Sequence, residues 1–474
     1  MNKLSHTESA ASSATAAAPQ PGKGARKGTV ALFAILVFTA ATGSLSQTAL
    51  NNMLTVAVDD FGIEVDLGQW ATTIYMLAMG VAVPLTGYLW RRLDNRNYTM
   101  MTLALMLAGS LIDFFAPTFA VLIVGRVMQA VAAGFSMAVM QTVAMTGFGS
   151  NKTATAMGIA GIAMGFAPNI GPTVGGLFVG GAGWRWFFVA LAAVPVVLMA
   201  LTLLTVPKGG EHDRSVKLDL ASFVVCAIGF GGLLTGFSEA STNGVGSLTM
   251  WIPVAAGVVF LWLFAHRQHR VQNPLINLDI FKSRKFKIGF WMNNLLFGSF
   301  MGITLIMPLY IEGAIGGTAA DAGTALLPGA IAALICNPLS GILGDKIGKT
   351  RVMKIAAAIM AAGALLALTY SESSPIWYVA MVQGIRGTGV SSSIGCMLAW
   401  LLEDLPRDIV ADGTSFSLVA RQASASLGTA VMVFLVTVVL DITGGGMLAY
   451  TCAFGFAALL AVVLLVMVFA YARE

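Results

Sequence analysis

The 474-residue sequence is poor in charge and poor in cysteine. Asp, Glu, Lys and Arg make up only 10% of the chain, whereas hydrophobic residues make up 57%. A soluble domain usually carries about a quarter charged residues, so this composition argues against a soluble enzyme. The cysteines are far apart and form no C-x-x-C pair, so we expect no disulfide framework, no metal site and no cofactor. They are Cys226, Cys336, Cys396 and Cys452.

Two further absences narrow the function. No phosphate-binding loop of the form G-x-x-x-x-G-K-[ST] occurs, which disfavours direct use of ATP. None of the four histidines lies in the interior of an apolar run, so no Ser-His-Asp or metal constellation can be assembled there. A membrane-embedded enzyme is therefore the weakest alternative. The net charge of +5 indicates no nucleic-acid partner, because basic loops beside a membrane account for it.

Apolar runs long enough to cross a bilayer fill the chain almost from end to end. A hydrocarbon core of about 30 Å needs about 20 residues of α-helix. The runs predict an all-α polytopic membrane protein with about 14 transmembrane helices. The predicted spans are 29–50, 68–90, 98–116, 119–146, 154–178, 185–206, 218–240, 250–266, 286–311, 321–343, 352–370, 376–402, 411–440 and 446–470.

The spans predict four segments. Residues 1–28, rich in Ala, Ser and Pro, are expected to form a disordered cytoplasmic tail. An N-terminal six-helix bundle at 29–206 is expected to precede an inserted two-helix hairpin with cytoplasmic linkers at 207–285. A C-terminal six-helix bundle then occupies 286–474. The 53 glycines favour close helix packing, because lipid gives no hydrophobic drive between helices.

The basic residues predict the topology through the positive-inside rule. All but four of the 27 Lys and Arg residues fall on the side of the predicted spans that holds the N-terminus. Arg126, Arg386 and Arg421 lie inside spans, and Arg185 lies at an outer end. We therefore expect a multi-pass protein of the cytoplasmic (inner) membrane with both termini in the cytoplasm.

An internal repeat relates the two halves. The loop after the second span begins Gly87-Tyr-Leu-Trp-Arg91-Arg92, and its later counterpart reads Gly341-Ile-Leu-Gly-Asp345-Lys346-Ile-Gly348-Lys349. An arginine inside a span follows each loop, Arg126 in the first half and Arg386 in the second. Repeated halves with a central binding site are common in secondary transporters.

The fifth predicted span carries the most specific pattern. It reads Gly165-Phe-Ala-Pro168-Asn-Ile-Gly171-Pro172-Thr-Val-Gly175-Gly176. Its glycines let a neighbouring helix approach, and its prolines remove backbone donors and bend the helix. With the repeated loops and the central hairpin, this pattern resembles the antiporter motif of the fourteen-span drug:proton antiporter (multidrug efflux) branch of the major facilitator superfamily. The resemblance covers roughly residues 29–470.

The resemblance implies a fold and a function. The fold is the major facilitator fold, with two six-helix bundles plus the inserted hairpin. The function is export of small amphipathic or drug-like compounds across the cytoplasmic membrane by proton antiport and alternating access. The expected partners are a small-molecule substrate, protons and the lipid bilayer, and we expect a monomer. A carrier specific for one metabolite or organic anion, working by uniport or uptake as well as export, remains an alternative.

The resemblance also assigns roles to loop and span residues. Asp345, with Gly341, Gly348 and Lys349, is expected to form a conformational latch that engages in one state only. The first copy of this loop has Arg91 where the acid is expected, so the resemblance supplies no latch there. Arg126 is assigned to proton coupling. Alternatively it ties helices together through backbone carbonyls, the role that we favour for Arg386 and Arg421.

The first span departs most informatively from the family. The family often has an acid in this span, and here Ser46 stands in its place in Leu45-Ser46-Gln47-Thr48-Ala49-Leu50-Asn51. Serine cannot titrate in the working range, so another group must carry the proton. Asp113 and Glu312 are the candidates, unless both are solvated at the headgroups. Large or polar side chains predicted to line the substrate cavity are Ser46, Thr48, Asn51, Trp70, Tyr75, Trp291 and Asn294.

Overall fold

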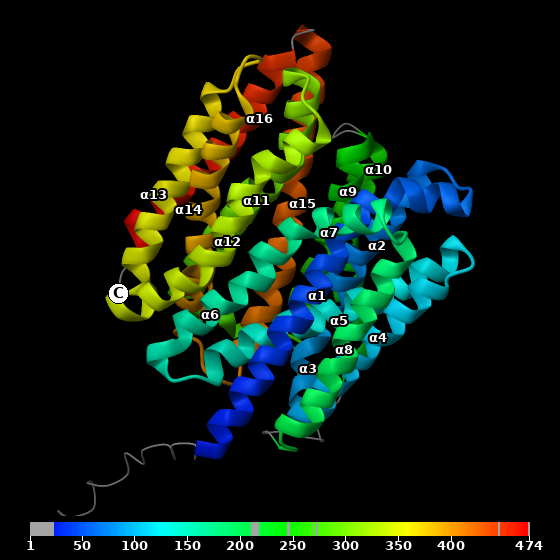
Figure 1. The fold of residues 1–474 in the computed structure, drawn as a ribbon. Helices are drawn as coiled ribbons and strands as arrows, with labels where there is room; N and C mark the ends of the chain where they lie inside the picture. Colours follow the sequence, from blue (N-terminus) through cyan, green and yellow to red (C-terminus); the bar gives the residue numbers. More distant parts are fainter. Residues whose placement is uncertain are drawn as a thin grey trace, which may run out of the picture.

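The computed structural model describes residues 23–209, 218–243, 247–268, 270–271, 274–443 and 446–472. Within these ranges every regular element is a helix, and the helices lie side by side along one elongated body (Figure 1). The fold expected from the long apolar runs, an all-helical bundle, is therefore present.

The first helix group comprises the helices before residue 206. Its second predicted span is two helices that meet at a 54° bend at Val83 and Pro84, where proline removes a backbone donor. Its fifth predicted span is interrupted by a π-helical turn, Ile162–Phe166. The helices are α1 (Lys23–Phe61), α2 (Val65–Ala82), α3 (Leu85–Arg92), α4 (Asn95–Phe115), α5 (Phe119–Thr146), α6 (Thr153–Gly161), α7 (Ala167–Gly180) and α8 (Trp184–Thr205).

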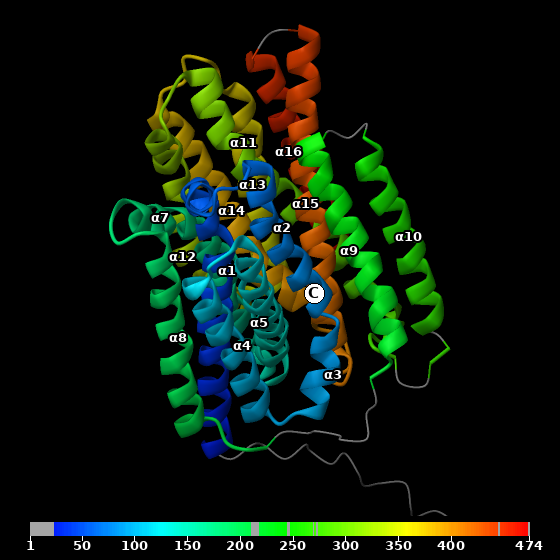
Figure 2. The ribbon, with the colours of Figure 1, turned by 90° about the vertical axis from the view of Figure 1, so that its right-hand side faces the viewer.

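The second helix group and a two-helix hairpin complete the body. The hairpin helices, α9 (Leu220–Asn243) and α10 (Leu248–Gln268), pack on each other at the side of the molecule, and α9 contacts α15 and α2 (Figure 2). The second group comprises α11 (Arg284–Tyr310), α12 (Ala319–Ile347), α13 (Lys349–Leu366), α14 (Ile376–Leu402), α15 (Val410–Thr443) and α16 (Gly446–Tyr471).

The expected number of spans is supported only in part. Twelve described helices are long and apolar enough to cross a membrane, and the bent pair α2–α3 would make thirteen. The remaining predicted span is α14, whose 27 residues include Gln383, Arg386 and several Gly and Ser. These residues lower its apolar character, although α14 packs against α12 and α13 within the body.

The first helix is longer than predicted. The span expected at 29–50 lies within α1, which has 39 residues and begins at Lys23, inside the segment 1–28 that we expected to be a disordered tail. Residues 1–22 lie outside the described part of the chain. The other predicted spans coincide with helices to within a few residues at each end.

The helix connections define two ends of the body. One end of the body holds the start of α1 and the α3–α4 and α12–α13 connections, with Arg92 in the last turn of α3 and Lys346 in the last turn of α12. We call this end the basic end. At this end Arg267 of α10 forms a 2.9 Å ion pair with Asp219 before α9, and its hydrogen bonds lower the pKa of Asp219 to about 2. This pair ties the two hairpin helices together at their base.

The two helix groups meet closely near the basic end. There α6 of the first group packs against α12 and α14 of the second, and α5 and α3 contact α15 (Figure 1). Glycines permit the approach: a Cβ placed on Gly341 would lie 2.3 Å from the carbonyl oxygen of Ala154, and one on Gly395 would lie 2.8 Å from Gly158 Cα. The groups are thus in direct backbone contact at this level.

Candidate functional site

A buried polar cluster surrounds Arg126 in the first helix group. The Arg126 guanidinium on α5 is fully buried. Its Nη1 donates to Ser46 Oγ at 2.8 Å, to the Ser46 carbonyl oxygen at 3.2 Å and to Gln129 Oε1 at 3.0 Å. The Tyr75 ring lies 4.3 Å from the guanidinium carbon, and Gln129 Nε2 donates to Ser110 Oγ at 3.0 Å. We call these residues, with Asp113, the Arg126 cluster.

Asp113 is the one acid of this cluster. Its side chain on α4 is fully buried, and neither carboxylate oxygen has a hydrogen-bond partner among the described residues. A Cβ on Gly125 would lie 2.0 Å from Asp113 Oδ1, so the absence of a side chain at Gly125 makes room for the carboxylate. The charges of Asp113 and the neighbouring Arg126 act on each other. An unpartnered acid within a membrane bundle is a candidate for proton transfer.

The second predicted proton carrier lies elsewhere. Glu312 follows α11 in a π-helical turn, Ile311–Ile315, and its side chain is exposed. The two acids that the sequence could not distinguish therefore differ in environment. Asp113 is buried, whereas Glu312 is exposed, so Asp113 has the environment that better suits a proton-coupling group.

The last turn of α12 joins the two helix groups. Asp345 Oδ1 accepts a hydrogen bond from Ala154 N at 3.0 Å, and Oδ2 accepts from Thr155 N at 2.7 Å and Thr155 Oγ1 at 2.6 Å. The carboxylate thus sits on the N-terminus of α6, where exposed N–H groups favour an anion. This is the geometry expected of a latch that holds the basic end closed.

Two other predicted latch residues, Gly348 and Lys349, act within the second helix group at the same end. Gly348 has a φ of 98°, which favours glycine, and it forms the tight link between α12 and α13. Lys349 Nζ donates to Glu403 Oε1 at 2.6 Å, and Lys285 Nζ lies 3.2 Å from Glu403 Oε2. These ion pairs join helices of the second group to one another.

A second bridge between the groups was missed from the sequence. Arg91 Nη1 lies 3.6 Å from Oδ2 of Asp412, which is buried in the first turn of α15. Asn277 N also donates to Asp412 Oδ2, at 3.2 Å. In the first copy of the loop, Arg91 therefore stands where the second copy has Asp345, and the acid of the ion pair, Asp412, lies on α15 of the other helix group. A lone acid in the first turn of an apolar span is the one sequence signal of this bridge.

The glycine–proline pattern of the fifth span packs α7 on α1. A Cβ on Gly171 would lie 2.0 Å from Thr48 Oγ1, and one on Gly175 would lie 2.3 Å from the Ala49 carbonyl oxygen. Gly176 faces open space, with nothing within 4 Å of such a Cβ. Pro168 and Pro172 lie in α7, directly after the π-helical turn. Gly165 faces α12 instead, where its Cβ would lie 3.1 Å from Asn337 Nδ2.

These adjacent glycines give a matched test of packing. Gly175→Ala is expected to lower the midpoint of thermal unfolding in detergent, because a methyl group there overlaps backbone and overpacking costs about 1–3 kcal/mol. Gly176→Ala is the control, with an unchanged or slightly higher midpoint, since alanine favours helix over glycine by about 1 kcal/mol. Equal midpoints for the two variants would contradict the close α1–α7 contact.

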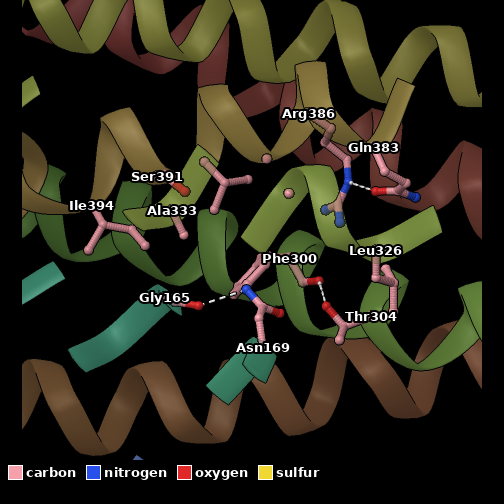
Figure 3. A pocket seen from close by; sticks show the side chains of 13 residues that line it. Gly165, Asn169, Phe300, Thr304, Leu326, Ala333, Gln383, Arg386, Ser391 and Ile394 are labelled. Carbon is pink, nitrogen blue, oxygen red and sulfur yellow. Dashed lines mark hydrogen bonds between the residues drawn. The ribbon is translucent and has the colours of Figure 1, made fainter. Parts of the chain in front are cut away.

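A small cavity, which we call the central cavity, lies between the helix groups (Figure 3). Its volume is about 20 Å³, room for about one water molecule. Arg386 reaches into it from α14, with Nε donating to Gln383 Oε1 at 2.9 Å, and Asn169 of α7 approaches from the other side. The lining residues are Gly165, Asn169, Phe300, Thr304, Leu326, Gly329, Ala333, Gln383, Arg386, Gly387, Val390, Ser391 and Ile394.

A larger cavity lies between the hairpin and the second group. Its volume is about 520 Å³, within the range of small-molecule sites, and its walls are mainly apolar, with seven aromatic residues among the sixteen that line it. Phe230 and Phe264 contribute from the hairpin, and Phe290 and Phe416 contribute from α11 and α15. We call it the lateral cavity. Trp291 and Asn294, two predicted cavity residues, are part of its lining.

The other predicted cavity residues are not gathered in one place. Ser46 and Tyr75 belong to the Arg126 cluster, where Tyr75 Oη donates to the Gly43 carbonyl oxygen at 2.8 Å. Thr48 packs against Gly171, and Trp70 is 42% exposed. The side chain of Asn51 is outside the part of the structure that is described. The residues predicted to line one cavity are therefore divided between the Arg126 cluster and the lateral cavity, and Thr48 and Trp70 belong to neither.

The remaining span arginines, Arg386 and Arg421, form no ion pair with an acid among the described residues. Arg421 on α15 donates from Nη1 to Met164 Sδ of the first group at 3.0 Å, and the Phe297 ring lies 4.5 Å from its guanidinium carbon. The Phe300 ring lies 5.9 Å from the guanidinium carbon of Arg386. Arg421 therefore contacts the first group through a methionine sulfur and not through the backbone carbonyls that were expected, whereas Arg386 lines the central cavity.

A multi-pass bundle of apolar helices, with two groups that meet at corresponding loops, is the architecture of a membrane transporter. The family model described as Major Facilitator Superfamily matches residues 36–429 and 289–474. The chain belongs to the major facilitator superfamily. This result agrees with the resemblance on which the sequence expectations rest.

Individual proteins with similar sequences or folds agree with this assignment. The chain is 31% identical over 402 residues to the lincomycin resistance protein LmrB of Listeria innocua, covering 83% of this chain and 84% of that protein. It is 27% identical over 387 residues to the multidrug resistance protein B homolog of Mycobacterium tuberculosis, covering 80% and 71%. These names are consistent with the drug-efflux branch. The solved structure of the proton:xylose symporter XylE shares the fold, with a TM-score of 0.64, 11% identity, and coverage of 94% of this chain and 96% of that one.

Proposed function

We propose that this protein exports small amphipathic or drug-like compounds from the cytoplasm in exchange for protons. The observation that carries the proposal is Asp113, a buried carboxylate without a hydrogen-bond partner in the described structure, beside Arg126. Such a group can take up a proton and release it when the helices around it move. The relatives named for lincomycin and multidrug resistance support the compound class.

The proposal includes a topology and a division of the chain. The basic end faces the cytoplasm, and both termini lie on that side of the inner membrane. Residues 29–206 and 286–474 act as two bundles that rock against each other, with the hairpin within 207–285 inserted between them, and the protein works as a monomer. The Asp345 contacts with α6 then close the cytoplasmic side in the conformation described here.

The lateral cavity supports an entry route for hydrophobic compounds. It lies between α10 and α11, and its mainly apolar walls suit apolar ligands without specifying one. Its volume of about 520 Å³ accommodates a drug-sized molecule, whereas the central cavity of about 20 Å³ does not in this conformation. We propose that a compound dissolved in the bilayer reaches the carrier through the lateral cavity.

A proton-release assay tests the exchange. Inside-out vesicles containing the protein are energised to form an inward-acidic gradient, and lincomycin and other cationic, neutral and anionic compounds are added. A transported compound is expected to dissipate the gradient, measured by a pH-sensitive dye, while vesicles without the protein give no response. Transport that persists unchanged after an ionophore collapses the gradient would contradict proton antiport.

A second candidate is a carrier specific for one metabolite or organic anion. It is favoured by the central cavity, whose lining contains an arginine and no Asp or Glu. This candidate predicts transport of one anionic compound in the same panel and no response to the cations. Gradient-independent transport of that compound would indicate uniport.

A further inference from the structure

The central cavity contains donors that have no acceptor. Arg386 is 3% exposed, and its Nη1 has no hydrogen-bond partner within the described residues. Gln383 uses its Oε1 to accept from Arg386 Nε, which leaves Gln383 Nε2 without a partner as well. Two buried donors on one turn of α14 therefore lie at the same cavity. Buried donors without acceptors are costly, and native structures usually satisfy them.

No acid in the cavity balances the arginine. Its thirteen lining residues include no Asp or Glu, and the only uncharged acceptor groups among their side chains are those of Asn169, Thr304, Gln383 and Ser391. Asn169 and Thr304 donate to the backbone carbonyls of Gly165 and Phe300, and neither accepts from Arg386 Nη1 in the described structure. The described neighbours of the Arg386 guanidinium are Gln383 Oε1, the Phe300 ring and, through electrostatics, Tyr370, and none of them is an acid.

We propose that Arg386 and Gln383 form a subsite for the carboxylate of an organic anion. The guanidinium would supply the charge and a fork of donors, and Gln383 Nε2 would supply a further donor, which is the pattern that carboxylates bind best. Phe300, Leu326, Val390 and Ile394 line the same cavity and suit an apolar or aromatic body. The substrates of this carrier would therefore include amphipathic anions, in contrast to a pump that selects cations with an acid.

In this conformation the cavity is smaller than a carboxylate, so it must widen before a ligand binds. About one water-sized group fits at Arg386 in this conformation. The body of the ligand must then occupy space that opens between α7 and the second helix group when the two groups separate. This proposal rests on the proposed transport function for its biological meaning, but the binding itself requires no proton gradient.

Binding of three matched compounds tests the subsite. The compounds are 2-naphthoate, the neutral 2-naphthamide and the cationic 2-naphthylmethylammonium, which share one ring system and differ in charge. They are titrated into the purified full-length protein in detergent, and binding is measured by calorimetry without a gradient. The wild type is expected to bind the carboxylate at least about tenfold more tightly than the amide, as a charge-assisted hydrogen bond would provide. Preference for the cation, or equal binding of all three, would overturn the proposal.

Variants locate the site. Arg386→Gln is expected to weaken naphthoate binding by about tenfold to a hundredfold and to leave naphthamide binding nearly unchanged. Arg386→Lys keeps the charge and should retain part of the preference, which covers the case where the Gln variant folds poorly. Arg185→Gln is the control. It removes a positive charge that forms an ion pair with Asp60 at the end of the body opposite the basic end, and this variant should bind as the wild type does. Unchanged naphthoate affinity in folded Arg386→Gln would place the anion elsewhere.

The binding test and the transport test fail independently. Naphthoate binding that depends on Arg386, together with no response of a proton gradient to any compound, would retain the subsite and reject proton antiport. Gradient-driven export of cations with no naphthoate binding would retain the exporter and reject the subsite.

Discussion

Asp113→Asn is expected to reduce uphill substrate transport to the level of vesicles without a proton gradient. The asparagine side chain has nearly the same size, so the packing against Gly125 is preserved, but an amide cannot carry a proton through the cycle. Substrate movement down its own concentration gradient should continue, because the cavities and latches do not contain this residue. The measurement is substrate uptake into inside-out vesicles with and without a gradient, alongside the thermal unfolding midpoint of each variant.

Glu312→Gln is the matched control for this prediction. It replaces the other acid that the sequence nominated with an isosteric amide, but at an exposed position. We expect proton coupling in this variant to equal that of the wild type. Coupling that is lost in Glu312→Gln and retained in Asp113→Asn would reverse the assignment of the proton carrier.

A rescue experiment separates coupling from stability. Ser46 Oγ lies 2.8 Å from Arg126 Nη1, so Ser46→Asp would place a carboxylate against the same guanidinium that Asp113 faces from α4. The double variant Ser46→Asp/Asp113→Asn is therefore expected to recover part of the gradient-dependent transport that Asp113→Asn loses. If the acid serves only to hold helices together, the double variant would recover the thermal unfolding midpoint of the wild type without recovering gradient-dependent transport.

This relation also explains what the sequence could reveal of the site. The sequence alone shows that Ser46 replaces the acid of the first span and that Asp113 and Glu312 are the candidate proton carriers. It also shows Arg126 within an apolar run, where a charged side chain is energetically costly and therefore indicates a function. The choice between Asp113 and Glu312 was not visible. Both lie near helix ends, and burial there depends on how the helices pack. In the structure the lack of a side chain at Gly125 admits Asp113 between α4 and α5.

The positions of most helices could be predicted from the sequence, because they depend on the lengths of the apolar runs. Spans such as 119–146 and 185–206 coincide with α5 and α8 to within one residue, because an apolar run of that length has few alternatives in a bilayer. The bridge between Arg91 and Asp412 was not predictable. It joins segments that are distant in sequence, and no periodicity within either segment identifies the other as its partner.

Asp345→Ala is expected to shift the protein toward conformations in which the basic end is open. The substitution removes three hydrogen bonds to Ala154 and Thr155, all accepted by a carboxylate at the N-terminus of α6. Charge-assisted hydrogen bonds contribute about 1.5–3 kcal/mol each. A net loss of about 3 kcal/mol would change the ratio of closed to open molecules by about a hundredfold. The bridge from Arg91 to Asp412 remains, so the closed state should become less populated but should not disappear.

Distances between spin labels at the basic end measure this shift. Labels at the exposed positions Asn151 and Arg407, in a background without the native cysteines, report the separation of the two helix groups. Asp404→Ala is the control, because Asp404 pairs with Lys285 within the second group at 3.0 Å and should not alter that separation. A broader or longer distance distribution in Asp345→Ala, absent from Asp404→Ala, is the expected result. Identical distributions in both variants would mean that the glycine contacts of α6 with α12 and α14 hold the basic end closed and that Asp345 adds no measurable stability to the closed state.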